Sequence, residues 1–393
     1  MTIDKFILGG GMPGIDKYAF KLWEHLVEEG GHDYILFQEK YRESSEFQKF
    51  PLEYFPTLRE LFGMKVTSAY RHDGEVCAAS NGRLLNKLKV RSYYFRKDFI
   101  RAAYLSSRNL DLVHYPTQLE RPYRFRNFRT VMTFHDAVPL VMPETLDDRI
   151  RAEMEEFIKR IQHVDCFIAV SQSTKDDMIR YLDISDWRIH VVHNGYDEGY
   201  RMIPDSGWVR DKYTGGKPFV LFVGTLEPRK NVPALIKAFH LLNRKGLRLV
   251  LAGNRGWEME EIDSLVETLK LGERVIFTGY VPEEDLIALY NMAEAFVYPS
   301  FYEGFGIPLI EAMVCGAPVI TSNTSSMPEV VGDAGLLIDP NRVEDLKSKL
   351  EMLLSEPALR SRMKEAGLER ARAFSWAKSA RETRAVYRKL VYA

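Results

Sequence analysis

The stretch 299–315, PSFYEGFGIPLIEAMVC, places two carboxylates on either side of a glycine-rich turn. Glu303 lies in the turn with Gly304 and Gly306, and Glu311 follows about two turns into the helix expected to begin there. Backbone N–H groups at such a helix start lack intrahelical partners, so they can hold phosphate oxygens. If the intervening residues are mostly helical, the carboxylates lie about 10 Å apart, the span from a sugar ring to a ribose across a diphosphate. The spacing predicts a nucleotide-sugar site, although an ordinary strand–loop–helix unit with surface glutamates has the same spacing.

Two basic residues, Arg229 and Lys230, supply positive charge for a diphosphate. They lie in the sequence GTLEPRKN, directly after an apolar strand expected at 219–223, and loops at this end of a parallel strand face the ligand side of a sheet. Two cations beside the helix start can neutralise a diphosphate without a divalent ion. No Asp-x-Asp sequence occurs in the chain, so no metal site is predicted. The alternative interpretation is a pair of solvated loop side chains.

The N-terminal half offers two further candidates. His135 and Asp136 follow the strand expected at 130–134, at the end of the strand where ligands of parallel sheets bind. A structural histidine is the alternative, but the position before a proline-rich loop favours a functional one. The glycines between Gly9 and Gly14 permit a tight turn close to a bound group, although they depart from the dinucleotide-binding GxGxxG form.

Strands and helices alternate along the chain, which predicts parallel sheets covered by helices on both faces. In the first half we expect strands at 5–8, 34–38, 112–115, 130–134, 166–170 and 189–193 and helices at about 15–29 and 146–163. After the strand at 166–170, Ser171, Ser173 and Thr174 are the candidates for a helix cap. The stretch 197–217 has no clear periodicity and separates two expected domains, 1–198 and 199–373. In the second half we expect strands at 219–223, 247–252, 275–278, 295–298, 319–321 and 335–338, helices at 232–243 and 283–291, and a helical segment from about 344 to the end.

Length and composition support this organisation. The 393 residues exceed what one hydrophobic core usually serves, so two domains are expected. The 54 basic and 55 acidic side chains nearly cancel, which leaves no overall field to attract nucleic acid. Cys77, Cys166 and Cys315 lack metal-ligand or disulfide spacing, which indicates a reducing compartment. The early apolar run is too short for a signal peptide and no run approaches the ~20 residues of a membrane span, so a cytoplasmic location is expected.

Basic and aromatic residues interleave between 83 and 129, a segment that ends in RPYRFRNFR. This mixture suits an anionic membrane surface or a lipid-phosphate acceptor, and a solvated helix face with a buried apolar side is the alternative. Peripheral contact with the inner face of the plasma membrane is therefore expected. Nucleic acid is the poorer interpretation, because no recognised binding module accompanies the segment.

Five short motifs carry a resemblance to a known family. EGFGIPLIE resembles the Glu-x7-Glu motif of the retaining glycosyltransferases of family 4, and GTLEPRKN, TFHDAVPL, VVHNGYD and MPEVVGDAG resemble that family's other landmarks in the expected order. The similarity runs over essentially the whole chain. It implies the α/β GT-B architecture, in which two Rossmann-like, doubly wound parallel-sheet domains face a cleft. The last residues, about 374–393, resemble the helix that crosses back onto the first domain.

The resemblance also implies roles for individual residues. Glu303 would contact hydroxyls of the donor sugar, and Glu311 would contact those of the ribose. Arg229 and Lys230 would bind the diphosphate, and His135 would line the sugar pocket. With Glu303, these three form the implied catalytic set, and the implied donor-binding positions are Gly11, Gly14, Gly224, Tyr280, Val281, Gly304, Phe305, Gly306 and Glu311. In that set the amides of Phe305 and Gly306 help hold the phosphates, and Tyr280 and Val281 border the base. Many relatives carry an arginine where this chain has Thr225, so the phosphate clamp must rest on Arg229 and Lys230.

The implied activity is hexosyl transfer from a nucleotide-diphosphate sugar to a saccharide or lipid-linked acceptor, with no metal or other cofactor. The wording EPRKN resembles mannosyltransferases that use GDP-mannose, which makes that donor the favoured one and a UDP-sugar the second. No carboxylate is placed as a nucleophile, so the family's front-face displacement with retention is expected. Two alternatives remain: a nucleotide-sugar 2-epimerase of the same architecture, and a catalytically silent module that binds a nucleotide sugar or a membrane surface.

Overall fold

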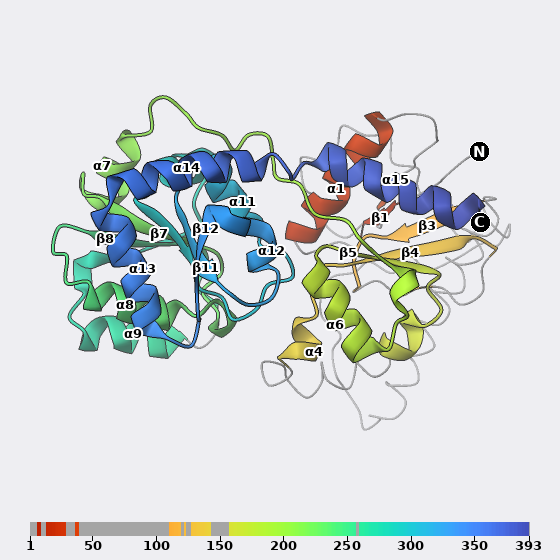
Figure 1. Cartoon of the computed structure of the whole chain (residues 1–393), viewed down its shortest axis with the longest axis horizontal. Coiled ribbons are helices and arrows are strands. Elements are labelled where there is room, and N and C mark those ends of the chain that lie inside the picture. The colour runs from red at the N-terminus through yellow and green to blue at the C-terminus, as the bar shows by residue number, and fades with distance from the viewer. Residues whose placement is uncertain are drawn as a thin grey trace, which may run out of the picture.

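Two parallel β-sheets of six strands each organise the described part of the chain (Figure 1). The computed structural model describes residues 6–8, 13–28, 36–38, 110–118, 122, 127–142, 157–256 and 259–392. The first sheet has the strand order β2-β1-β3-β4-β5-β6, and the second has the order β12-β11-β10-β7-β8-β9. All neighbouring strands in both sheets run parallel, as the alternating pattern of the sequence predicts.

The first sheet and its helices come from the N-terminal half of the chain. Its strands are β1 (Phe6–Leu8), β2 (Leu36–Gln38), β3 (Leu112–Tyr115), β4 (Arg129–Phe134), β5 (Cys166–Ala169) and β6 (Ile189–Val191). Its helices are α1 (Pro13–Glu28), α4 (Val138–Val141) and α6 (Gln172–Leu182), and residues 157–161 are also helical. Ser171, one of the predicted candidates, caps α6, because its extended backbone lets the side chain accept a hydrogen bond from the Thr174 amide.

The second sheet follows after residue 218. Its strands are β7 (Phe219–Val223), β8 (Arg248–Ala252), β9 (Val275–Gly279), β10 (Ala295–Tyr298), β11 (Val319–Ser322) and β12 (Gly335–Ile338). Its helices are α7 (Trp208–Thr214), α8 (Val232–Leu241), α9 (Met259–Thr268), α10 (Glu283–Met292), α11 (Ile307–Val314), α12 (Met327–Val331), α13 (Val343–Ser355) and α14 (Pro357–Ala371). The all-apolar strand β7, FVLFV, lies inside this sheet with helices on both faces, which is why its first four side chains are buried.

The C-terminal helix α15 (Trp376–Tyr392) leaves the second sheet and lies beside α1 (Figure 1). Trp376, Ala380 and Tyr387 join Tyr18 and Leu22 of α1 in one buried apolar cluster. The Tyr387 hydroxyl also lies 2.6 Å from Nδ1 of His114, a buried residue of β3. Both apolar packing and a buried hydrogen bond therefore hold the last helix on the first sheet.

Several elements differ from the sequence-based expectations. The boundary stretch 197–217 contains the short helix α7, which ends at Gly215 in the left-handed conformation. The helix α9 was not expected, and the segment expected to be helical from about 344 to the end forms the three helices α13, α14 and α15. Gly14, expected as the last residue of the glycine loop, lies within the first turn of α1, because this helix begins at Pro13, two residues before the expected start. The chain changes sheets between β6 and β7, and the boundary at 198 and 199 stays a prediction.

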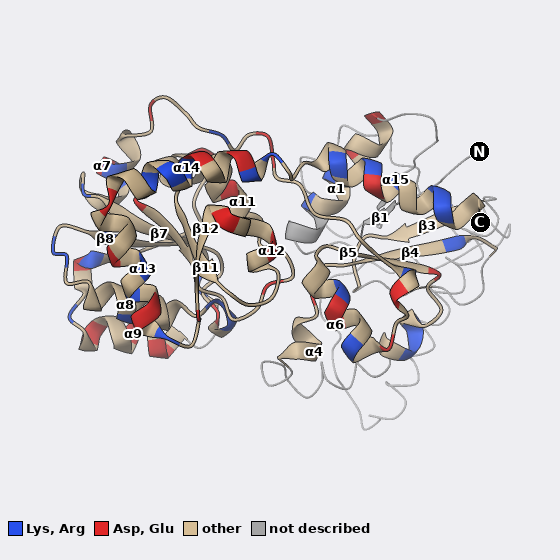
Figure 2. Ribbon diagram, viewed as in Figure 1, with Lys and Arg blue, Asp and Glu red and all other residues tan. Residues whose placement is uncertain are grey.

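Charged residues of both signs are interspersed over the two halves of the molecule (Figure 2), in keeping with the near-zero net charge. Within the residues that the structure describes, no helix is both long enough and apolar enough to cross a membrane. Most of the basic and aromatic segment at 83–129, and with it the predicted membrane surface, lies outside the described residues.

Candidate active site

A buried carboxylate, Glu303, forms the centre of the predicted site. It lies between β10 and α11 and is only 7% exposed. Its Oε1 atom is 2.6 Å from Nζ of Lys230, and its Oε2 atom is 2.9 Å from a guanidinium nitrogen of Arg229. Burial raises the pKa of a carboxyl group, but the charges of Lys230 and Arg229 outweigh it and lower the pKa of Glu303 to about 2. Glu303 is therefore ionised throughout the physiological range.

The two cations come from a short 3₁₀ turn, Pro228–Lys230, that follows β7. Arg229 also donates to the Glu227 carboxylate and, at 2.7 Å, to the backbone carbonyl of Tyr302. Burial opposes the charge of Arg229, but Glu303 and Glu227 outweigh this effect and raise its pKa. Burial lowers the pKa of Lys230, and its ammonium group donates to the Tyr298 hydroxyl as well as to Glu303. The cations predicted to bind a diphosphate are thus paired with protein carboxylates.

The neighbouring Gly304 brings the two halves of the molecule into direct contact. A Cβ atom at Gly304 would lie 1.7 Å from the backbone oxygen of His135, which follows β4 in the first sheet. No side chain fits there, so glycine is required for this approach. Gly306 has φ of 102° and precedes the first residue of α11, a left-handed conformation that also favours glycine. The structure therefore brings together predicted residues of both domains, His135 from the first and Gly304 from the second.

One ring nitrogen of His135 is hydrogen-bonded within the protein, and none of the described residues bonds the other. Its Nε2 atom lies 2.7 Å from the carbonyl oxygen of Pro116, which can only accept, so Nε2 carries the proton. Burial lowers the pKa of His135, which favours the neutral ring with Nδ1 as an acceptor. The ring of Tyr18 packs edge-on against it at 4.6 Å between centroids. None of the described residues bonds Nδ1, so this atom can accept a hydrogen bond from a sugar hydroxyl, and the predicted role stays a prediction.

Glu311 occupies a different environment from Glu303. The helix α11 begins only at Ile307, so Glu311 is its fifth residue and lies about one turn into it rather than two. Gly306 causes the delay, because its left-handed backbone ends the turn before the helix can start. Glu311 is 9% exposed and accepts a hydrogen bond from Tyr290 at 3.2 Å. Burial raises its pKa to about 7, although the charge of Lys17 on α1 opposes this shift.

The remaining predicted positions vary in how the structure places them. Gly224 has φ of 146°, and a Cβ atom there would lie 3.9 Å from Cε of Lys230. Phe305 is buried, and its ring stacks on His193 with 5.7 Å between centroids. Tyr280 is 77% exposed and Val281 is buried beside it, and no described contact joins either of them to Glu303. Gly11 lies outside the described residues.

Some residues of this site were not predicted. Tyr298, the last residue of β10, bonds Lys230, and Glu227 bonds Arg229. Glu227 stands in the same EPRKN sequence, which was the available signal, whereas nothing in the sequence pointed to Tyr298. Among the described residues, no group of three or more His, Cys, Asp or Glu side chains could hold a metal ion.

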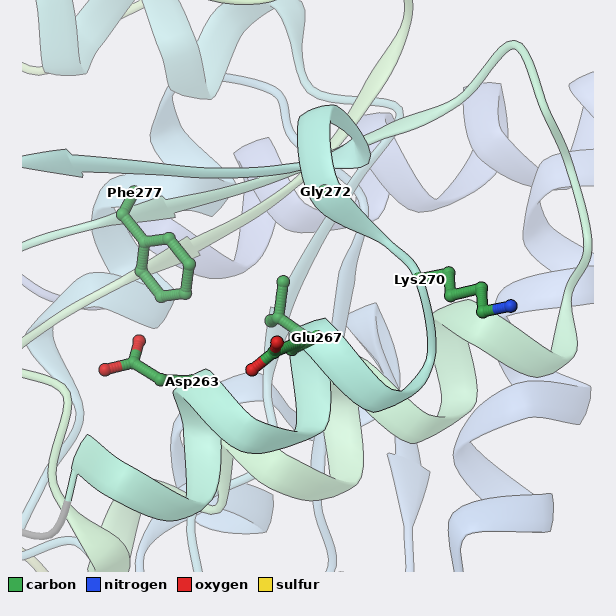
Figure 3. A pocket seen from close by; sticks show the side chains of 6 residues that line it. Asp263, Glu267, Lys270, Gly272 and Phe277 are labelled. Atoms are coloured by element: carbon green, nitrogen blue, oxygen red, sulfur yellow. The ribbon is translucent and has the colours of Figure 1, made fainter.

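Two cavities lie in the second domain. One, of about 480 Å³, is lined by side chains of α9 and β9 together with Lys270 and Gly272 (Figure 3). None of the predicted site residues lines it. A second, of about 370 Å³, is lined by Glu227, Pro228 and Asn231 of the loop that carries the two cations, together with residues of α8, α9 and the loop before α13, but not by Arg229, Lys230 or Glu303. The predicted site is therefore defined by its contacts between the domains and not by either cavity.

Comparison with known proteins agrees with this geometry. The family described as "Glycosyltransferase Family 4" matches residues 13–200, and "Glycosyl transferases group 1" matches residues 210–370. The O-antigen chain mannosyltransferase B of Escherichia coli is 37% identical over 289 residues, which cover 71% of this chain and 75% of that protein. This chain belongs to glycosyltransferase family 4. The predicted class, a glycosyltransferase that transfers a hexose, is confirmed.

Other similar proteins match this chain over different fractions of their own length. The serotype-specific mannosyltransferase WbdA of Escherichia coli is 35% identical over 264 residues, but the match spans only 32% of its length. Sucrose-phosphate synthase from Thermosynechococcus elongatus superposes over 100% of both chains with a TM-score of 0.72 and 22% identity. Anabaena HepE in complex with UDP-glucose gives a TM-score of 0.72 at 18% identity over 99% of this chain and all of its own. These structures confirm the predicted GT-B fold.

The approach of Gly304 to His135 gives a test of the assembled site. Because a methyl group at Gly304 would collide with backbone, we expect Gly304→Ala to hold the domains apart and lower kcat/KM on the order of 100-fold. Gly246→Ala is the matched control, since its Cβ would meet nothing within 4 Å. Steady-state kinetics with thermal unfolding as a check on folding measures both variants. Wild-type kinetics in Gly304→Ala would contradict the contact.

The buried Glu311 predicts a pH dependence of stability. Its pKa is higher in the folded protein, about 7, than the ordinary 4.5, so the folded state binds more protons between these values. Its stabilising contribution is complete below pH 4.5 and is lost as the pH rises through 7, by about 3 kcal/mol at most. In Glu311→Gln this loss disappears. Urea unfolding should therefore show that the free energy of unfolding of the variant, relative to that of the wild type, is higher at pH 8 than at pH 5. The control Glu365→Gln, at an exposed position, should show the pH dependence of the wild type. If Glu311→Gln also shows the wild-type pH dependence, the raised pKa of Glu311 is refuted.

Proposed function

We propose that the protein transfers mannose from GDP-mannose to a saccharide or lipid-linked acceptor. The observation that carries the proposal is the match to mannosyltransferase B of Escherichia coli over three quarters of that protein's length. The sequence EPRKN, whose Arg229 and Lys230 contact Glu303, resembles enzymes with this donor. A UDP-sugar is the second candidate donor, because Anabaena HepE, which shares the fold, was solved with UDP-glucose.

Each part of the cluster has a proposed task on the donor. Lys230 and Arg229 bind the diphosphate and stabilise the negative charge that it develops as it leaves. The amides of Phe305 and Gly306, to which no described residue offers an acceptor, add hydrogen bonds to the phosphates without a divalent ion. Glu303 then accepts hydrogen bonds from the sugar hydroxyls. Glu311 does the same for the ribose, and ionised Glu311 is the stronger acceptor.

The proposed stereochemical course is the one that the resemblance to the retaining glycosyltransferases of family 4 implies, and none of these residues is assigned as a nucleophile. Glu303 is ionised but held by two cations, so it serves hydroxyl binding rather than attack on the anomeric carbon. We propose front-face displacement with retention. The bond between C1 and the phosphate oxygen breaks, the acceptor oxygen bonds C1 from the same face, and the acceptor's proton passes to the departing phosphate.

The test is a donor panel with the purified protein and mannose-terminated oligosaccharides as acceptor probes. We expect release of GDP from GDP-mannose, and a product whose anomeric configuration by NMR matches that of the donor. Lys230→Met should lower kcat/KM by about 100- to 1,000-fold, because a positive charge at the leaving group is lost. Lys237→Met is the control, since that lysine is half exposed and its carboxylate partner is 3.9 Å away. Normal turnover in Lys230→Met would contradict the proposed role of this lysine. Release of UDP alone across the panel would contradict GDP-mannose as the donor.

Contact with an anionic membrane surface is a separate proposal that rests on the sequence of residues 83–129. The positive charges there should attract anionic lipid and lose that attraction in salt, because screening shortens the reach of surface charge. Co-sedimentation with phosphatidylserine vesicles at low and high salt measures it, with phosphatidylcholine vesicles as the control. If the protein does not bind phosphatidylserine vesicles at low salt, the proposed membrane contact is refuted.

A further inference from the structure

Two buried hydroxyl groups of the first domain bind one backbone carbonyl of the second. Ser171, the cap of α6, donates from Oγ to the oxygen of Gly304 at 2.7 Å, and Thr174 donates to the same oxygen from Oγ1 at 3.1 Å. Both side chains are fully buried. The Ser171 hydroxyl also accepts from the Thr174 amide at 3.0 Å, so the bond that caps the helix and the bond across the domains use the same oxygen atom.

These bonds fix the direction of the next amide along the chain. A peptide unit is planar and trans, so its carbonyl oxygen and its N–H point to opposite sides. With the Gly304 oxygen held against α6, the N–H of Phe305 points away from α6. No described residue accepts a hydrogen bond from this amide. The orientation of a free N–H in the second domain is thus set by hydroxyl groups of the first.

The second domain holds the same loop by other means. Ser326 donates to the carbonyl oxygens of Glu303 and Phe305, both at 2.9 Å, and Ser325 accepts from the Glu303 amide at 3.0 Å. The Gly304 carbonyl has no such partner among the described residues of its own domain. Among the carbonyl oxygens of residues 303–305, the described side chains of the second domain bind those of Glu303 and Phe305. The oxygen of Gly304 is bound by described side chains of the first domain.

A carboxylate from the second domain keeps the start of α6 in place. Glu329 of α12 accepts from the Gln172 amide at 2.8 Å and lies 2.6 Å from Nε2 of His193. Burial raises the pKa of Glu329, but His193 and the Gln172 amide outweigh it and lower the pKa. Farther along the helix, Tyr302 donates to Asp177 at 2.7 Å. The first turns of α6 are thus bonded to the second domain between Ser171 and Thr174, at the Gln172 amide, and again beyond Thr174, at Asp177.

We propose that Ser171 and Thr174 are positioning residues for the donor diphosphate. They turn the peptide between Gly304 and Phe305 so that its N–H faces the phosphates, and they do so only when the two domains are closed. Donor binding to the second domain is thereby coupled to closure of the first. The inference rests on the proposed function, in which the Phe305 amide contacts the diphosphate.

The test compares variants within one turn of α6. Thr174→Val removes a hydroxyl that is not the cap and keeps the shape of the side chain, and Ser171→Ala removes the other donor. Ser173→Ala is the matched control, because among the described residues its backbone amide bonds Glu329 but its hydroxyl bonds nothing in the second domain. We expect inhibition by GDP to weaken by about 3- to 10-fold for each lost hydrogen bond, with Ser173→Ala unchanged. Inhibition by guanosine, which has no phosphate, should stay at the wild-type value in all three.

The comparison of GDP with guanosine separates positioning from general damage. A variant that merely loosens the fold would weaken both inhibitors, and this result, like unchanged GDP inhibition in Thr174→Val, would overturn the inference. If the donor panel selects a UDP-sugar, UDP and uridine replace the two probes. If no donor in the panel is turned over, the proposed function is overturned. Calorimetry of GDP and UDP binding to the wild type and the variants would still decide the positioning role. A wild-type protein that binds neither nucleotide would overturn both.

Discussion

The structure depends on keeping a charged carboxylate, Glu303, inside the protein. Removing an ion of this size from water costs several kcal/mol unless opposite charges and hydrogen bonds replace the solvent. Lys230 and Arg229 provide those charges, and the topology of the sheet makes this possible. The strands β7 and β10 are parallel neighbours, so the loop after β7, with the cations, and the loop after β10, with Glu303, leave the same edge. The site exists because two separate βα units share one sheet edge.

The same loop after β10 also joins the domains. Gly304 follows Glu303 directly and contacts the backbone of His135, which follows β4 of the first sheet. A buried ion pair on one side and a backbone contact on the other leave the loop little freedom. Glycine at position 304 is therefore a packing requirement, while glycine at 306 meets a conformational one, since φ there is 102°. Two glycines of one motif thus have different physical reasons.

The sequence predicted most strands well because apolar runs such as 219–223 and 295–298 are short, fully buried and bounded by turn residues. It also predicted a helix cap among Ser171, Ser173 and Thr174, since capping is a local interaction, and the structure places the cap at Ser171. It could not predict the bond from Ser171 to Gly304, which joins residues 133 positions apart. Nor did it predict the pairing of Glu303 with Lys230, 73 positions away, because each residue was assigned to the ligand alone. The helix α11 begins after Gly306 as predicted, but Glu311 lies about one turn into it rather than two, since spacing does not reveal the left-handed backbone of Gly306.

The charge balance of the cluster explains why amide groups matter beside the two cations. Glu227, Arg229, Lys230 and Glu303 carry two negative and two positive charges, which sum to zero. In the proposed function a diphosphate adds negative charge to this neutral set, so the cations would then be shared between Glu303 and the phosphates. Backbone N–H groups can bind phosphate without adding a side-chain charge that would itself need a partner when the donor is absent. Their strength depends on direction, and for Phe305 that direction is held by hydroxyl groups of the opposite domain.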